Sequence, residues 1–509
     1  MTIRSTKKGT GPNPHRGIAW NSVYNLISIG SRRGFMSIVL LCFAAVLSIQ
    51  EYALITVAIS LAGVVTILAN WGYVATITRY VSGTILRSGR YQTKRLARRL
   101  IARQTVVAIG TLLVFSFLAP FVGPLLHIEW PMYILACFLG LFVSLTEALN
   151  AVLSGLEKFQ TLAGINFAWF LGTVLVALAL LGIGIGFKSA SFSLAFLVVA
   201  FITLTVSIGL VSSRGLSGGV DDSAIPLTPW REITEYCRHS GWFSIVGSIL
   251  YYRTEVLFLR HWSTAQNVAA YALGQTLASV LFIALIRGVV GTLLPRFSKL
   301  HALGRKEQLE SLYVSVQRML LYLLFPAAVF CIIVAPALIP LAFGLQYQQS
   351  VMVFQLFVPI FVLTSHSAVG QSYLFAISRQ RPLVPLLTIC LFLNLLLDLT
   401  LIRPWGILGA VLGVGIPLLV AGYGSLALAG MNRAILPGIW PAAKGTACMT
   451  AYALGANYIG RNFSWVYLTG FSIVIMGGYV VLMMPEFRTT WESLRRFELV
   501  FATATSEGT

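Results

Sequence analysis

The residues from 51 to 79 read EYALITVAISLAGVVTILANWGYVATITR, and no charged side chain lies between Glu51 and Arg79. A helix rises about 1.5 Å per residue, so an uncharged stretch of this length can cross the roughly 30 Å hydrocarbon layer of a bilayer. This stretch therefore predicts a transmembrane helix over residues 53–78.

The composition extends this interpretation to the whole chain. Of the 509 residues, 57% are hydrophobic and only 10% are charged, whereas soluble domains carry about 25% charged residues. This difference excludes a soluble globular enzyme. Fourteen stretches are long and apolar enough to span a membrane: 19–49, 53–78, 105–126, 131–153, 161–185, 190–212, 241–260, 268–294, 317–343, 349–376, 383–402, 406–430, 442–459 and 463–485.

The basic residues predict how these spans are oriented. With the N-terminus inside the cell, 28 of the 36 Lys and Arg residues fall in cytoplasmic loops, four fall outside and four fall within spans. Retention of basic loops in the cytoplasm produces such a split. We therefore expect a multi-pass membrane protein with both termini in the cytoplasm. Because the net charge of +20 reports topology, we expect no nucleic-acid partner.

The chain is also internally duplicated. Tyr-Ala-Leu at 52–54 recurs at 271–273, and Phe-Val at 142–143 recurs at 361–362, so both motifs repeat at the same offset. The offset covers six spans, an even number, so the two copies enter the membrane in the same direction as parallel repeats. We expect an all-α polytopic membrane protein with about 14 transmembrane helices, in two six-helix lobes plus two C-terminal helices. The predicted divisions are an N-lobe at 1–213, a cytoplasmic linker at 214–240, a C-lobe at 241–430, and helices 13 and 14 with a cytoplasmic tail at 431–509.

Arginines inside the spans indicate a site for an anion. An arginine at the centre of a spanning helix costs about 2.5 to 3.5 kcal/mol, so we expect these side chains to face water or a ligand. Asn25, Ser28 and Arg32 share one face of the first span, and Arg253 follows Arg32 at close to the repeat offset. The predicted substrate-binding residues are Arg32, Arg33, Arg253, Arg287, Asn25, Ser28 and Asn70, with Asn70 the counterpart of Arg287 in the repeat.

Three of these arginines also have a purely structural interpretation. Arg32 and Arg33 can mark the inner interface of the first span, with side chains that snorkel to the headgroups. Arg253 can pair with an acid on a neighbouring helix; it lies two positions before Glu255, so the two side chains point to different helix faces.

Other polar residues in the spans are candidates for ion coupling or gating. Glu147 and His366 are separated by the repeat offset and so occupy equivalent positions in the two copies; Glu255 is the third candidate. The alternative for Glu147 and His366 is packing or hydrogen bonding. Asp398, near the outer end of its span, is interpreted as a cap or interface residue.

The basic stretch from Arg79 to Arg103 carries Leu86, Leu96 and Leu100 between its charges. This pattern predicts an amphipathic helix on the inner membrane surface, where it fixes topology by touching anionic headgroups. The alternative is that it gathers a phosphorylated lipid substrate.

Several stretches resemble a known superfamily. They include SILYYRTEVLFLRHW at 248–262, LLPRFSKLHALGRKEQL at 293–309 and NLLLDLTLIRPWGILGAVLG at 394–413. These patterns, in this order, resemble the oligosaccharide and polysaccharide flippases of the multidrug/oligosaccharidyl-lipid/polysaccharide exporter (MOP) superfamily. The pair Ser31-Arg32 resembles a Ser-Arg pair of the lipid II flippase branch, whereas spans seven and eight resemble the O-antigen and exopolysaccharide branch.

The resemblance implies a flippase that moves an undecaprenyl-diphosphate-linked oligosaccharide across the bacterial cytoplasmic (inner) membrane by alternating access, with Arg32 at the pyrophosphate. It implies as partners the polyprenyl-diphosphate-linked glycan, membrane lipids, and a polysaccharide polymerase and glycosyltransferases. We expect no catalytic residue, metal or cofactor, because no phosphate-binding glycine-rich loop occurs and the cysteines have no paired spacing. The alternatives are a cation-coupled multidrug exporter of the same superfamily and, less favoured, a membrane glycosyltransferase or polymerase.

Overall fold

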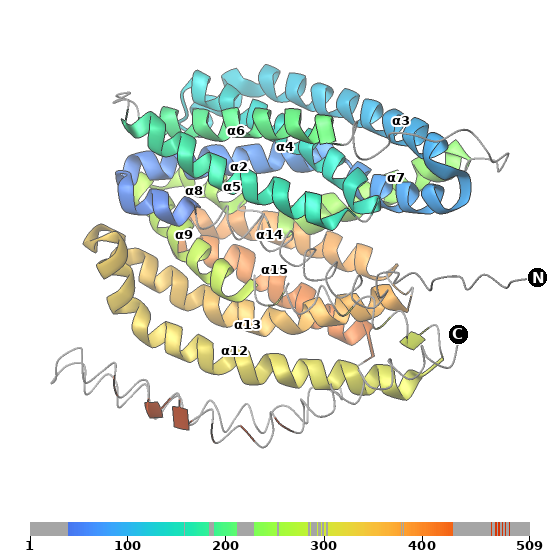
Figure 1. Ribbon diagram of the computed structural model, residues 1–509. Helices are drawn as coiled ribbons and strands as arrows, with labels where there is room; N and C mark the ends of the chain where they lie inside the picture. The colour runs from blue at the N-terminus through green and yellow to red at the C-terminus, as the bar shows by residue number, and fades with distance from the viewer. Residues whose placement is uncertain are drawn as a thin grey trace, which may run out of the picture.

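The computed structural model describes residues 39–156, 158–182, 188–210, 229–251, 254–283, 304–377 and 381–430, with isolated positions at 286–301, 379 and 470–488. In this part of the chain the secondary structure is helical throughout, as expected (Figure 1). The first half contains α2 (Ile49–Asn70), α3 (Tyr73–Leu125), α4 (Trp130–Gly155), α5 (Phe159–Gly182) and α6 (Lys188–Leu210). The second half contains α7 (Trp230–Tyr251), α8 (Thr254–Trp262), α9 (Ala265–Ala278), the π-helix η2 (Ser279–Ile283), α12 (Lys306–Phe343), the 3-10 turn η3 (Leu345–Tyr347), α13 (Gln348–Ala376), α14 (Leu383–Trp405) and α15 (Ile407–Leu428).

The protein is a multi-pass membrane protein. Within the described residues, six helices are long and apolar enough to cross a bilayer: Ile49–Asn70, Tyr91–Leu125, Trp130–Gly155, Leu345–Ala376, Leu383–Trp405 and Ile407–Leu428. Most of the first predicted span, all of the thirteenth and most of the fourteenth lie outside the described residues, so the expected total of 14 remains a prediction.

Local sequence signals explain both ends of α2. Ser48 is the N-cap: its hydroxyl accepts from the Glu51 amide, and the Glu51 carboxylate accepts from the Ser48 amide at 3.1 Å, which forms a capping box. The helix ends where Trp71 and Gly72 both adopt positive φ, at 33° and 75°. A Cβ atom at position 72 would lie 2.3 Å from the Gly241 nitrogen of α7, so only glycine allows this close approach.

The long helix α3 folds back on itself. If α3 were straight, Gln104 would lie about 45 Å from the start of the helix, at about 1.5 Å per residue. Instead, the Gln104 amide donates a hydrogen bond of 3.0 Å to Asn70, which lies just before the helix. The two limbs of α3 therefore run antiparallel, with the turn beside α7 at the right of Figure 1.

This arrangement corrects the expected surface helix at residues 79–103. Leu96 and Leu100 are buried in a core cluster with Ala148 and Val152 of α4. Their apolar side is thus covered by protein, although we expected it to be covered by the membrane surface. Hydropathy cannot distinguish these two kinds of apolar neighbour.

The predicted linker contains the beginning of a helix. Residues 230–240 form the first three turns of α7, and two arginines of α3 stack on its aromatic rings. The Arg79 guanidinium lies 4.3 Å from the centroid of Tyr236, and that of Arg103 lies 4.0 Å from the centroid of Trp230. These cation–π contacts attach the start of the second half to the first half.

The two halves repeat one packing pattern. In the first half α4 packs on α2, α3 and α6, and in the second half α13 packs on α9, α12 and α15. Both α2–α4 and α9–α13 meet at a glycine: a Cβ atom at Gly140 would lie 2.7 Å from the Cβ of Val65, and one at Gly274 would lie 2.7 Å from the Cβ of Val353. These two helix pairs therefore approach equally closely, and the division into two duplicated lobes stays a prediction.

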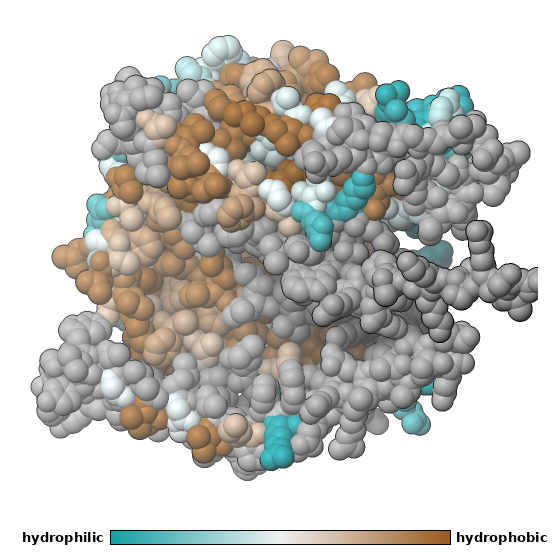
Figure 2. All heavy atoms as spheres, viewed as in Figure 1, coloured by the Kyte–Doolittle hydropathy of each residue, from teal (hydrophilic) through white to brown (hydrophobic). Residues whose placement is uncertain are grey.

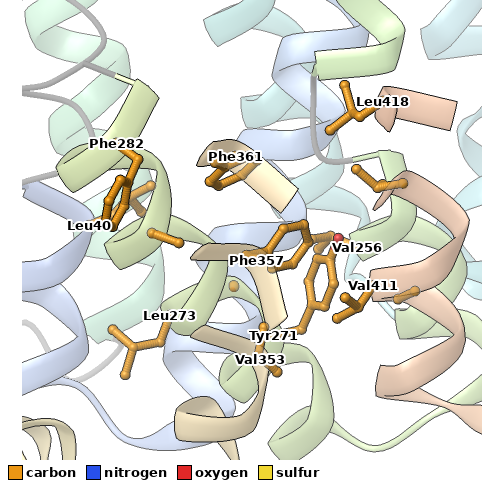
Figure 3. Close-up of a cluster of buried hydrophobic side chains, with 14 of the residues drawn as sticks. Leu40, Val256, Tyr271, Leu273, Phe282, Val353, Phe357, Phe361, Val411 and Leu418 are labelled. Carbon is orange, nitrogen blue, oxygen red and sulfur yellow. The ribbon is translucent and has the colours of Figure 1, made fainter. Parts of the chain in front are cut away.

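A large apolar core crosses from one half to the other. It includes residues of α2, α9, α13 and α15, and Figure 3 shows Val256, Tyr271 and Phe357 side by side within it. The rings of Tyr52 in α2 and Tyr347 in η3 meet edge to face with centroids 6.0 Å apart. The helices α2, α8 and α9 therefore form the central part of the described contact between the halves, above α12 and α13 in Figure 1, and α3 with α7 forms a further part.

Candidate substrate and coupling site

The structure describes only some of the residues that the sequence singles out. Asn70, Glu147 and Glu255 are described with their side chains, and His366 is described only as part of α13. The remaining predicted site residues lie outside the described residues: Asn25, Ser28, Arg32, Arg33, Arg253 and Arg287. The arginine-lined site therefore remains a prediction.

Asn70 and Glu147 belong to one polar cluster inside the first half. The Asn70 amide nitrogen donates to the Glu147 carboxylate. The Asn70 side-chain oxygen accepts from the Ser144 hydroxyl at 2.9 Å and from the Gln104 amide at 3.0 Å. The Gln104 amide also donates to the Ser144 carbonyl at 3.1 Å. These hydrogen bonds join α2, α3 and α4. Asn70, Gln104 and Ser144 are buried, and the Glu147 carboxylate at the edge of the cluster is half-buried.

The cluster fixes the orientation of Asn70. Because two donors point at its oxygen, its nitrogen must face Glu147, and the carboxylate acts as the acceptor. Hydrogen bonds thus connect Glu147 through Asn70 to Gln104 in α3. Sequence analysis identified Asn70 and Glu147 but missed Gln104 and Ser144, because the fold-back of α3 brings Gln104 to this place.

Glu255 lies near the beginning of α8 and is 1% exposed. The Tyr271 hydroxyl of α9 donates to its carboxylate at 3.4 Å. Tyr271 is the repeat counterpart of Tyr52, and its ring also packs on Phe357 of α13 with centroids 5.7 Å apart. Glu255 is thus buried near the contact between the halves, at the beginning of α8, whereas the sequence placed it only within the predicted span 241–260.

Asp398 corrects an expectation. The sequence places it near the end of a span and suggests a cap or interface residue, but the structure buries it completely, about two turns before the end of α14. Neither carboxylate oxygen has a hydrogen-bond partner among the described residues. A Cβ atom at Gly413 of α15 would lie 2.2 Å from one of these oxygens. Because a buried carboxylate is costly unless it binds a proton or a cation, Asp398 is a candidate for ion coupling.

One signal in the sequence indicates this buried position. Asn394 and Asp398 stand at positions i and i+4 in an otherwise apolar segment and so share a helix face. The Asn394 amide donates to the Gly413 carbonyl at 2.8 Å. Both side chains therefore face α15, where glycines leave room for them.

The folding pattern defines the class of protein. Superposition on the structure titled "Lipid II flippase MurJ, inward closed conformation" gives a TM-score of 0.67 at 13% identity and covers 91% of this chain and 99% of that chain. An inward-facing multidrug resistance MATE family transporter of the MOP superfamily gives 0.60 at 14% identity, covering 81% and 94%. A MOP superfamily transporter from Pyrococcus furiosus gives 0.58 at 14% identity, covering 85% and 100%. The chain has the fold of this class of transporters and flippases.

The sequence comparison narrows the class to a family. Residues 18–301, more than half of the chain, match the family described as "Polysaccharide biosynthesis protein". The chain belongs to this family. No curated protein matches it in a sequence search.

Proposed function

We propose that the protein is a flippase that moves an undecaprenyl-diphosphate-linked oligosaccharide across the bacterial inner membrane. The observation that carries this proposal is the family match over residues 18–301, because a polysaccharide biosynthesis protein that is itself a multi-pass membrane protein handles glycans at the membrane. The likeness of its fold to that of a lipid II flippase supports a lipid-linked form of the glycan. O-antigen and exopolysaccharide precursors are the substrates that we favour.

In this proposal, alternating access exposes the glycan headgroup to each side of the membrane in turn. The pyrophosphate lies beside Arg32, Arg33, Arg253 and Arg287, with Asn25, Ser28 and Asn70 on the sugars, while the lipid tail stays in the bilayer. A guanidinium presents a planar fork of donors that matches phosphate oxygens, and exclusion of water strengthens the pairing. A polymerase and glycosyltransferases that use the same lipid carrier are the proposed partners.

Ion coupling is the proposed source of energy. Glu147, Glu255 and His366 are the candidates from the sequence, and Asp398 joins them because it is buried without a hydrogen-bond partner among the described residues. A membrane potential that is negative inside adds about 2.3 kcal/mol per charge per 100 mV to the outward movement of an anionic headgroup.

A cation-coupled multidrug exporter is the second candidate. The observation that favours it is the burial of two carboxylates, Glu255 and Asp398, in a fold that multidrug transporters share. An exporter of cationic drugs requires acidic groups at the substrate itself, whereas the predicted substrate site here is lined by arginine.

Two experiments separate these functions. Mass spectrometry of lipids that copurify with the protein should detect a polyprenyl-diphosphate glycan. Arg32→Ala and Arg253→Ala should each abolish glycan export while the protein remains folded and inserted, whereas Arg403→Ala, at an exposed position, should not. Full export by both site variants, or a purified protein that carries a bound cationic drug and no glycan lipid, would overturn the proposal.

A further inference from the structure

The second limb of α3 has an outward face that no other described helix covers. Val106 is 71% exposed, Leu113 64%, Phe117 76% and Phe121 71%. Their spacings of seven, four and four positions place them on one face of the helix. In a membrane protein, large apolar side chains exposed in this way contact lipid chains.

The same helical face becomes basic toward the fold-back. Arg95, Arg98 and Arg99 are exposed, and steps of three and four positions lead from them through Ala102 to Val106. Arg99 and Val106 are about 10 Å apart along the axis, at about 1.5 Å per residue. If the apolar stripe lies in the hydrocarbon layer, these three arginines lie in the headgroup layer. In Figure 2, hydrophilic side chains gather at the right-hand end of the upper half, and hydrophobic side chains lie along the adjoining part of the upper edge.

These three arginines differ from their neighbours in their contacts. Arg79 and Arg103 stack on the rings of Tyr236 and Trp230. Within the described chain, Arg95, Arg98 and Arg99 have neither a carboxylate nor an aromatic partner. Three adjacent guanidinium groups thus repel one another with no carboxylate of the described residues to balance them, and an external anion would relieve this repulsion.

We propose that Arg95, Arg98 and Arg99 bind the headgroup of an anionic phospholipid, whose acyl chains lie along the apolar stripe of α3. Guanidinium groups bind phosphate through paired, charge-assisted hydrogen bonds. Each basic residue near an anionic lipid surface is worth about fivefold in binding, the equivalent of about 1 kcal/mol. The occupant is a lipid, and not a soluble phosphate, because the apolar stripe continues from the arginines along the same face. This inference is independent of the proposed glycan substrate.

Lipid binding to these arginines should stabilise the contact between the halves. Arg103 lies one turn after Arg99 and stacks on Trp230 of α7 at 4.0 Å. A phosphate group at Arg99 neutralises like charge beside this contact and holds the start of the second limb of α3 in place. Anionic lipid should therefore raise the melting temperature of the whole protein.

The test compares two charge-matched variants of the full chain. One variant carries Arg95→Gln, Arg98→Gln and Arg99→Gln, and the control carries Arg231→Gln, Arg238→Gln and Arg381→Gln, three other exposed arginines. Each protein is reconstituted in phosphatidylcholine vesicles with and without phosphatidylglycerol, and its melting temperature is measured. Native mass spectrometry then counts the phosphatidylglycerol molecules that remain bound.

The wild type and the control should melt at a higher temperature with phosphatidylglycerol, and the α3 variant should lose this increase together with at least one retained lipid. The proposal is overturned if the α3 variant keeps the full increase, or if the control loses it equally, since the effect would then come from overall charge. It is also overturned if glycerol phosphate, added to the phosphatidylcholine vesicles, produces the same stabilisation as the lipid. Displacement of phosphatidylglycerol by a polyprenyl diphosphate at equal concentration would assign the surface to the substrate and would likewise overturn it.

Discussion

The Arg260 guanidinium donates a hydrogen bond of 3.1 Å to the carbonyl of Leu126, although 134 residues separate them. A second nitrogen of the same group donates to the His127 carbonyl at 3.1 Å, and His261 Nδ1 donates to the Leu125 carbonyl at 2.9 Å. The last carbonyls of a helix lack partners within it and carry its negative dipole end. Two side chains at the end of α8 in the second half thus cap α3 of the first half.

Loss of this cap should destabilise the contact between the halves. Arg260→Ala leaves two carbonyls without their charged donor, so we expect the free energy of unfolding to fall by about 1.5 to 3 kcal/mol. Arg260→Lys should recover only part of the loss, because one ammonium lacks the fork that reaches both carbonyls. Chemical unfolding in detergent micelles measures both values. Arg403→Ala, an exposed arginine in the last turn of α14, is the control, and an equal effect there would contradict the role of the cap.

The class of fold could be predicted because both the hydropathy and the nearly constant offset between repeated motifs can be read from the sequence. The capping box of Ser48 and Glu51 was also present in the sequence, yet the predicted span begins at residue 53 because hydropathy reports the membrane and not the helix. The start of α7 at Trp230 was missed for the same reason, since Arg231, Glu232 and Glu235 interrupt the apolar pattern.

The rest of the candidate site depends on long-range contacts. Gln104 reaches Asn70 only because α3 folds back, and Arg103 meets Trp230 although α4, α5 and α6 lie between them in the sequence. The i, i+4 spacing of Asn394 and Asp398 indicates a shared polar face, but it does not reveal that α15 is the helix that buries this face. A single sequence carries no signal for such pairs, so these partners appear only in the structure.

The close contacts between α2 and α4 and between α9 and α13 should respond equally to a larger residue at their glycines. Gly140→Ala and Gly274→Ala each place a Cβ atom 2.7 Å from a valine Cβ and from a carbonyl oxygen. The helices must move apart, so each variant should lose about 1 to 3 kcal/mol of stability. Gly164→Ala in α5, where a Cβ atom would meet nothing within 4 Å, should be neutral or gain up to about 1 kcal/mol from helix propensity. Thermal unfolding in micelles measures all three, and equal stability of the three would show that the contacts are loose.

Two variants at Glu147 distinguish the contribution of its hydrogen bond from the contribution of its charge. Glu147→Gln keeps an oxygen that accepts from Asn70, so we expect stability close to that of the wild type. Glu147→Leu leaves the Asn70 amide without its acceptor and should cost about 1 to 3 kcal/mol. If Glu147 takes part in coupling, Glu147→Gln should also lose transport in vesicles with an imposed ion gradient. Full transport by this folded variant would show that Glu147 acts as a hydrogen-bond acceptor and not in coupling.

Removing the charge of Asp398 should not lower stability, in contrast to removing the acceptor at Glu147. The carboxylate is 0% exposed, and neither oxygen has a hydrogen-bond partner among the described residues, so removing its charge relieves a desolvation cost. Asp398→Asn should therefore unfold at the same temperature as the wild type or higher. If Asp398 binds the coupling ion, transport by this variant should no longer respond to a sodium or proton gradient imposed across vesicles. Asn394→Leu serves as the comparison, because it removes the neighbouring hydrogen bond to Gly413 without changing charge; it should lower stability and keep the response to the gradient. An Asp398→Asn protein that unfolds readily would mean that the carboxylate is a structural hydrogen-bond acceptor, and a retained gradient response would place the coupling ion elsewhere.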